Sequence, residues 1–346
     1  MYDIKPVYNI KSMHNIKSGY CLKILTALLL LVSSSLTFAT GEKLEKLTLS
    51  GPFAAVSNPM IRMINANALQ DVAERVEFVV WKDPDQMRAL ALNGKTDFIA
   101  TPTNVAANLY NRGKQLTLLN VSIWGIMWMV SRDPELKTLA DFKGKEIAMP
   151  FRGDMPDLVF REVAERQGLN PRRDFNLRYV ANPLDAMQLL ILRRVDHALL
   201  VEPAISMALR KTKSFPAKLI APDLYRTADM QEEWGKVFNS PPEVPQAGIA
   251  LLNTGLPKRV VKRFMEEHQK AVQWCNDHPD EAGKIVAERI DMLTPEAVSD
   301  SIRISNIKQV SSRAAKKELE HFFRVLHKRK PALVGGKLPD DGFYYP

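Results

Sequence analysis

The chain has 346 residues, of which 46% are hydrophobic and 25% are charged, and its formal net charge is +9 at pH 7. This composition is typical of a globular protein with one large domain or two, and it excludes a low-complexity or disordered chain. Two cysteines exclude a disulfide-dense scaffold, and Lys and Arg are spread along the chain rather than gathered as in a nucleic-acid-binding surface.

The first 39 residues differ from the rest of the chain. Lysines precede an apolar run at residues 24–32, and small residues lead to Ala39. A basic flank, a short apolar run and a small-residue exit predict a cleaved secretory signal peptide over residues 1–39. An uncleaved N-terminal anchor is the alternative, and Met13 is an alternative start. Cleavage leaves Cys275 as the single cysteine, so no intramolecular disulfide is expected.

The rest of the chain alternates between strand and helix patterns. Short apolar runs that end in turn residues predict strands, and prolines or capping residues before a period of 3.6 predict helix starts. The predicted strands are residues 46–50, 75–81, 98–100, 115–121, 124–131, 145–149, 176–180, 196–201, 217–221 and 246–253. From Pro257 onward the chain is predicted to be nearly all helix. This alternation indicates a mostly parallel α/β fold with a helical C-terminal tail.

Two stretches of the chain share one order of features. Residues 83–112 and residues 182–211 each begin with an Asx-Pro pair, continue as a helix, open a strand with Asp, and pass through a proline turn into a second helix. Two helix–strand–helix units can look alike without any common role. The functional interpretation is two lobes of the same build, with a ligand cleft between their strand ends.

Three segments of the chain carry a family resemblance: LALNGKTDFIATPTNVAANL, LADFKGKEIAMP and LLILRRVDHALLVEPAISMAL. In this order they resemble periplasmic substrate-binding proteins of ABC importers, of the class that includes nitrate-, sulfonate-, taurine- and thiamine-precursor-binding proteins. The resemblance extends over residues 47–272. It implies a two-lobed periplasmic-binding-protein-like α/β fold of type II. Each lobe is then a mostly parallel sheet flanked by helices, with a two-segment hinge between the lobes and a helical C-terminal tail.

The resemblance also implies an assignment of the chain to lobes. Lobe one is expected at residues 44–130 plus 246–300, lobe two at residues 131–245, and the C-terminal helices and tail at residues 301–346. The chain is expected to cross near residues 130–134 and to return near residues 241–246.

In function, the resemblance implies a periplasmic, monomeric solute receptor that passes a small organic ligand to the membrane permease of an ABC importer. We expect no cofactor, no metal and no nucleic-acid partner. The sequence has no phosphate loop, no G-x-G-x-x-G, no H-E-x-x-H and no G-x-S-x-G, so we expect no enzymatic activity. An enzyme of cofactor-precursor biosynthesis on the same fold and a ligand-sensing module are the alternatives.

Candidate ligand-binding residues lie in the loops at the predicted strand ends. Hydroxyl and amide side chains there can bind a ligand or cap helices, and two aromatic rings can stack on a flat ligand. The candidates are Phe53, Ser57, Asn58, Thr101, Thr103, Asn104, Trp124, Arg152, Asp154, Glu202 and Gln246.

Two of these candidates decide the charge of the expected ligand. The guanidinium of Arg152 could hold a carboxylate or sulfonate, or it could form a salt bridge to Asp154, Asp157 or Glu202. Glu202 could bind a ligand donor or cap its own helix. A small organic molecule with a flat or apolar body and one polar end therefore fits these residues better than bare nitrate does.

Overall fold

The computed structural model describes residues 42–215, 218 and 223–346. Leu44–Pro346 form one compact unit. The predicted signal peptide and, apart from Lys218, the predicted strand at residues 217–221 lie outside the described residues. No helix in the described part of the chain is long and apolar enough to cross a membrane.

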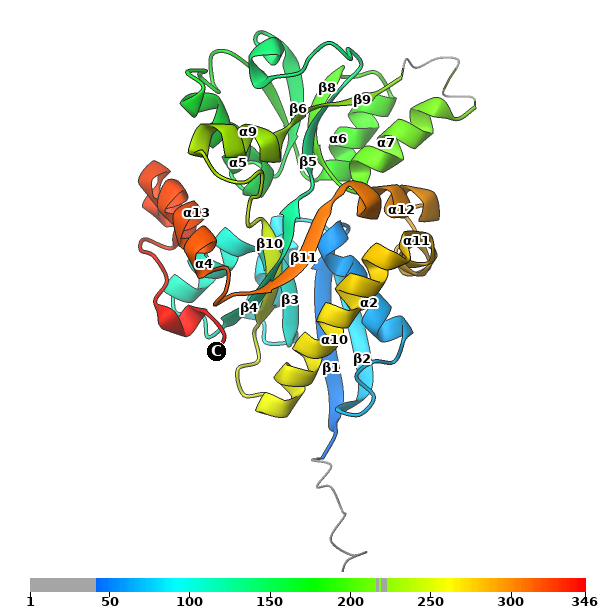
Figure 1. The fold of residues 1–346 in the computed structure, drawn as a ribbon, viewed down its shortest axis with the longest axis vertical. Coiled ribbons are helices and arrows are strands. Elements are labelled where there is room, and N and C mark those ends of the chain that lie inside the picture. Colours follow the sequence, from blue (N-terminus) through cyan, green and yellow to red (C-terminus); the bar gives the residue numbers. More distant parts are fainter. Residues whose placement is uncertain (1–41, 216–217, 219–222) are drawn as a thin grey trace, which may run out of the picture. The chain divides into compact units, whose positions relative to one another are not determined.

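The first sheet has six strands in the order β11-β4-β10-β3-β1-β2 (Figure 1). These strands are β1 (Leu44–Pro52), β2 (Ala73–Trp81), β3 (Phe98–Pro102), β4 (Thr117–Gly125), β10 (Ala247–Leu251) and β11 (Asn306–Ser311). β1 pairs in parallel with β2 and β3, and β10 lies antiparallel between β3 and β4, so β1 to β4 run in one direction. The sheet carries η1 (Ala55–Ser57), α2 (Asn58–Asn65), α3 (Pro84–Leu92), α4 (Thr103–Asn111), α10 (Lys258–Asp277), α11 (Pro279–Arg289) and α12 (Pro295–Ile304). We call this sheet with these helices lobe one.

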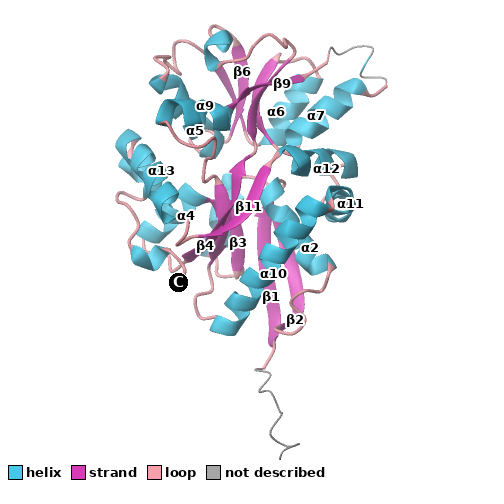
Figure 2. Ribbon diagram, in the orientation of Figure 1, coloured by secondary structure: helices cyan, strands magenta, loops and turns pink. Residues whose placement is uncertain are grey.

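The second sheet has five strands in the order β7-β6-β8-β5-β9. These strands are β5 (Met127–Ser131), β6 (Glu146–Pro150), β7 (Asn176–Val180), β8 (His197–Val201) and β9 (Tyr225–Asp229). β6 pairs in parallel with β7 and β8, whereas β5 is antiparallel to β8 and β9. The sheet carries η2 (Leu139–Phe142), α5 (Met155–Arg166), α6 (Pro183–Ile191), α7 (Ala204–Lys213) and α9 (Met230–Phe238), and helices flank both sheets (Figure 2). We call this part lobe two, and the predicted two-sheet α/β fold is confirmed.

The chain passes between the lobes twice, and one buried glutamine holds both passages. Gln231 is 4% exposed. Its Oε1 accepts a hydrogen bond from Met127 N at 2.9 Å and from Gln246 Nε2 at 3.0 Å, and its Nε2 donates to Met127 O at 3.0 Å. A Cβ on Gly125 would lie 2.9 Å from the Gln231 side chain, so the absence of a side chain there leaves room for the glutamine.

The first crossing lies earlier than the sequence indicated. Residues 124–131 were expected as one strand, but Gly125 still pairs with β11 and Met127 already pairs with β8. The chain therefore leaves lobe one at Ile126. The sequence did not indicate this break because the apolar pattern continues across Ile126, although the residues before and after it belong to different sheets. We accordingly propose residues 44–125 as the first segment of lobe one.

The C-terminal segment also differs from the all-helical expectation. β11 pairs antiparallel with β4 at the edge of lobe one. The short polar run NIKQVS contains one buried apolar residue, Ile307, which is too weak a pattern to predict a strand.

After β11 the chain reaches both lobes through α13 (Lys316–Arg329), η3 (Pro331–Val334) and η4 (Asp341–Phe343). Tyr345 N donates to Leu118 O of lobe one at 3.0 Å, whereas Arg329 pairs with Glu162 and Glu165 of α5 in lobe two.

A buried histidine in lobe one predicts a loss of stability in acid. His268 of α10 is fully buried, its Nδ1 is hydrogen-bonded to Gln309, and burial lowers its pKa to about 4. In the unfolded chain the ring takes up a proton near pH 6.5, while the folded chain keeps it neutral. The free energy of unfolding should therefore fall by about 3 kcal/mol between pH 6.5 and pH 4 on account of His268.

The measurement is chemical denaturation of the wild type and of His268→Gln at several pH values. The variant should lose this part of the pH dependence, whereas His278→Gln, at an exposed position in the connection from α10 to α11, should keep it. Parallel pH curves for wild type and His268→Gln would contradict the assignment.

Candidate functional site

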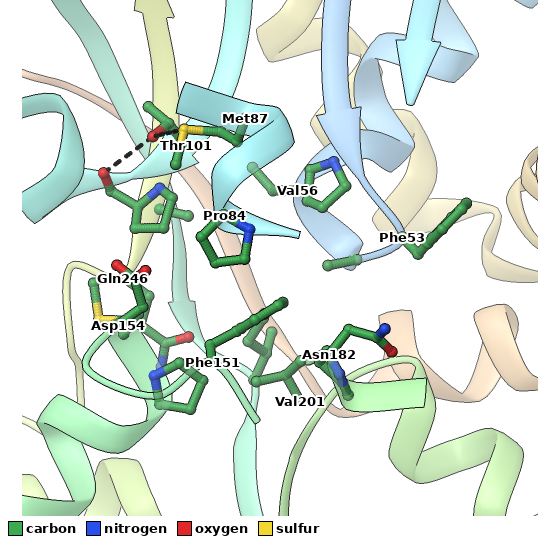
Figure 3. A pocket seen from close by; sticks show the side chains of 18 of the residues that line it. Phe53, Val56, Pro84, Met87, Thr101, Phe151, Asp154, Asn182, Val201 and Gln246 are labelled. Atoms are coloured by element: carbon green, nitrogen blue, oxygen red, sulfur yellow. Dashed lines mark hydrogen bonds between the residues drawn. The ribbon is translucent and has the colours of Figure 1, made fainter. Parts of the chain in front are cut away.

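A cavity of about 100 Å³ lies between the two sheets. Residues at or just beyond the C-terminal ends of β1, β2, β3, β6, β7 and β8 line it, together with residues of both crossings. This is the edge at which open α/β sheets bind ligands. Its lining includes Phe53, Trp81, Met87 and Thr101 from lobe one, Phe151, Asp154, Asn182 and Val201 from lobe two, and Gln246 from the return crossing (Figure 3).

Proline rings cover the helix starts that face this cavity. Pro84 and Pro183 are the first residues of α3 and α6, and Pro156 is the second residue of α5. Proline has no backbone N–H, and the side chain of Asp83 accepts from Asp85 N and Gln86 N of α3, while that of Asn182 accepts from Asp185 N of α6. These prolines therefore place apolar carbon at the three helix starts and remove one backbone donor from each.

Phe151 reaches the cavity from a turn with a strained backbone. Its φ is +56°, a left-handed conformation that is uncommon for a bulky residue. The turn is held because Asp154 N donates to Phe151 O at 2.8 Å and Gly153 N donates to Asp157 Oδ2 at 2.8 Å. Figure 3 shows the Phe151 side chain extending from lobe two toward lobe one, and Phe53 lies farther along the cavity. The buried carboxylate of Asp157 thus helps to hold a strained backbone, which indicates that the position of the Phe151 ring is important for the site.

Two buried polar residues, Gln246 and Asp154, lie at the other end of the cavity from Phe53 (Figure 3). Asp154 is 7% exposed and accepts a hydrogen bond from Arg88 Nη2 of lobe one at 2.8 Å. Burial raises the pKa of Asp154 above the ordinary value, while the charge of Arg88 opposes this shift. Gln246 is 2% exposed.

Four of the eleven candidates from the sequence line this cavity: Phe53, Thr101, Asp154 and Gln246. The hydroxyl of Thr101 lies 3.4 Å from Pro102 O and 3.5 Å from Met87 Sδ. The contact of these four candidates with a ligand stays a prediction.

The side chains of three other candidates donate hydrogen bonds to backbone carbonyls of lobe one or of the return crossing. Ser57 Oγ donates to Pro52 O at 2.7 Å, and Thr103 Oγ1 donates to Pro245 O at 2.6 Å. Trp124 Nε1 donates to Lys308 O at 3.2 Å, which fixes the indole between β4 and β11. The structure does not bring these side chains into the cavity.

Asn58 and Asn104 are buried outside the cavity. The expected capping role of Asn58 is wrong, because Asn58 is the first residue of α2 and Ser57 stands at the N-cap position without a side-chain cap. Asn104 lines a second groove together with Arg112, Lys114 and Asp154, the last of which also lines the cavity.

The structure does not pair Arg152 with Glu202. Arg152 is exposed, and its guanidinium lies 5.0 Å from the ring centre of Tyr179. Glu202 is fully buried, pairs with Arg226, and accepts a hydrogen bond from Ser206 N at 3.1 Å, so it caps α7. Burial raises the pKa of Glu202, and Arg226 opposes that shift.

Two residues at these sites were not singled out from the sequence. The residues around Arg226 do not mark it as the partner of Glu202. Only the rule that a buried carboxylate needs a partner could have indicated that a cation lies beside Glu202. Phe151 stood in a loop that the sequence analysis placed at a strand end, but its left-handed backbone has no signature in sequence. In the described part of the chain, no group of His, Cys, Asp and Glu side chains comes together as a metal site requires.

Comparisons with known proteins agree with this arrangement. No protein-family model and no curated protein sequence matches the chain. Among solved structures, an ABC transporter from Parabacteroides distasonis is 25% identical, with a TM-score of 0.70, covering 87% of this chain and 99% of that one.

Two further solved structures share the fold at lower identity. The ligand-binding component of an ABC-type import system from Staphylococcus aureus is 12% identical, with a TM-score of 0.67, covering 87% of this chain and 97% of that one. The periplasmic aliphatic sulphonate binding protein from Escherichia coli is 16% identical, with a TM-score of 0.64, covering 87% and 92%. The structural neighbours are thus periplasmic binding proteins of ABC importers, the class that the sequence motifs resemble.

The buried Glu202–Arg226 pair makes a testable prediction. Arg226→Met leaves a fully buried carboxylate without its cation, which should lower the free energy of unfolding by about 3–5 kcal/mol. The double variant Arg226→Met/Glu202→Gln should recover much of this loss. Chemical denaturation measures both.

Arg152→Met is the matched control, because it removes an exposed arginine that lies over a ring. It should change the free energy of unfolding by less than about 1 kcal/mol. An Arg226→Met variant as stable as this control would show that Glu202 does not depend on Arg226.

Proposed function

We propose that this chain, which has the fold of the ligand-binding components of ABC importers, captures a small, flat and largely apolar organic molecule between its lobes and delivers it to the membrane permease of an ABC importer. The observation that carries the proposal is the apolar cavity at the strand ends of both sheets, with Phe53 contributed by lobe one and Phe151 by lobe two. Residues from two lobes can enclose a ligand only when the lobes are together.

The mechanism follows from this shared lining. The ligand contacts both lobes in the closed state and one lobe in the open state, so it shifts the equilibrium toward closure by its difference in affinity. Ligand pockets commonly measure 300–1,000 Å³. The cavity here, of about 100 Å³, is smaller than this range and favours a small ligand of about the size of one ring.

The flat body is favoured over a sulfonate or carboxylate for a geometric reason. Arg152, the expected anion partner, does not line the cavity, and proline rings cover three helix starts. The sulphonate-binding neighbour from Escherichia coli supports transport of a small solute, and we do not extend its ligand to this chain.

The setting of the proposed function is the periplasm. The predicted cleaved signal peptide and the likeness to periplasmic binding proteins support export, and we propose that the mature chain acts as a monomer with the permease as partner. These neighbours are transport-associated binding proteins rather than enzymes, which favours transport over catalysis.

Native mass spectrometry of the protein purified from its own host tests the proposal. The wild type should carry a small co-purified molecule, and Phe151→Ala should weaken that molecule's affinity about 10- to 100-fold, because burying an aromatic ring contributes about 1.5–3 kcal/mol. Phe215→Ala removes a ring that is 81% exposed and should leave the affinity unchanged.

Scattering measured with and without the ligand adds the test of closure. Compaction on binding is expected, and binding without compaction would contradict the closure mechanism. Equal ligand retention by Phe151→Ala and wild type would contradict the location of the site.

A further inference from the structure

The orientation of the Gln231 side chain is fixed by backbone groups. A backbone N–H can only donate and a backbone carbonyl can only accept. Because Met127 N lies 2.9 Å from one end of the Gln231 amide and Met127 O lies 3.0 Å from the other, Oε1 must face the N–H and Nε2 the carbonyl. Nε2 also donates to Asp229 Oδ1 at 2.8 Å, which agrees with this orientation.

This orientation in turn fixes Gln246 at the cavity. Gln231 Oε1 can only accept, so the Gln246 amide, 3.0 Å away, must turn its Nε2 toward Gln231. Gln246 Oε1 is left as the other end of that amide, and it accepts no hydrogen bond from the described residues. A residue that is 2% exposed and lines the cavity thus has a free acceptor, while one of the two N–H donors of its amide is used by Gln231.

The neighbouring Asp154 also has a free acceptor, and the neighbouring Trp81 uses its donor within the protein. Asp154 Oδ2 accepts from Arg88 at 2.8 Å, and its Oδ1 accepts no hydrogen bond from the described residues. Trp81 also lines the cavity, but its Nε1 donates to Ala100 O at 3.2 Å. Acceptors are therefore available at this end of the cavity, while the indole donor is used within lobe one.

Three further lining residues carry side-chain donors. The Thr101 hydroxyl donates to Pro102 O at 3.4 Å and to Met87 Sδ at 3.5 Å within lobe one. The Asn182 amide is engaged at the start of α6, where Nδ2 donates to Asp185 Oδ2 at 2.9 Å and Oδ1 accepts from Asp185 N at 3.0 Å. Lys82 carries the one cationic side chain among the lining residues, and it is exposed. An anionic ligand would have to depend on Lys82, with Asp154 repelling it.

We propose that the cavity selects a flat ligand whose polar end donates hydrogen bonds, such as an aromatic amine or amidine, to Gln246 Oε1 and Asp154 Oδ1. This inference rests on the proposed function, and it names the ligand class for the same cavity. Neither acceptor has a hydrogen-bond partner among the described residues, so a donor on the ligand satisfies both, and a positive charge on it is attracted by Asp154. The ring of the ligand then extends toward Phe151 and Phe53.

The test compares two probes of the same shape and opposite character, benzamidine and benzoate, by saturation-transfer NMR and isothermal titration. Benzamidine should bind saturably and more tightly than benzoate. Gln246→Met should weaken benzamidine about tenfold or more, since a buried acceptor is lost. Gln273→Met, the same change at an exposed glutamine of α10, should have no effect.

Asp154→Asn provides a second variant that leaves the Gln231–Gln246 contact in place, and it should also weaken benzamidine. Tighter binding of benzoate, lost in Lys82→Met, would overturn the proposal and leave a receptor for anions. Failure of benzamidine to bind saturably would also overturn it. The proposed function is judged separately, by the co-purified molecule and by Phe151→Ala.

Discussion

The hydrogen bonds of the buried Gln231 side chain hold together the two segments of chain that pass between the lobes. A single amide serves Met127 on the way into lobe two and Gln246 on the way back. Because Gln246 also lines the cavity, the crossings and the candidate site share one hydrogen-bond network. A ligand that touches Gln246 therefore touches a group on which the position of both crossings depends.

Away from the crossings, the lobes are joined by ion pairs at more exposed positions. Arg88 pairs with Asp154, and Arg210 of α7 pairs with Asp300 of α12, where the two side chains are 49% and 36% exposed. The exposed Arg210–Asp300 pair contributes about 0–1 kcal/mol, whereas the carboxylate of the Arg88–Asp154 pair is 11% exposed. In the mechanism that we propose, opening of the lobes breaks these ion pairs and leaves both sheets in place, so that the contacts of a small ligand contribute to the equilibrium.

The sequence predicted what depends on local pattern and missed what depends on distant partners. The helix start at Asp83-Pro84 and the alternating α/β order were predicted because capping residues, prolines and apolar runs are local, whereas the two-sheet fold was implied by the repeated units and the family resemblance. The crossing at Ile126 was placed too late because one apolar run serves two sheets. The Arg226 partner of Glu202 and the left-handed turn at Phe151 come from tertiary packing, and neither has a signature in the surrounding residues.

The most direct measurement is a crystal structure of the protein purified from its own host with its co-purified molecule retained. Density for a flat molecule is expected between the Gln246 and Asp154 end of the cavity and Phe53, with Phe151 in contact and the Gln231 hydrogen bonds intact. A ligand bound elsewhere, with this cavity empty, would contradict the account.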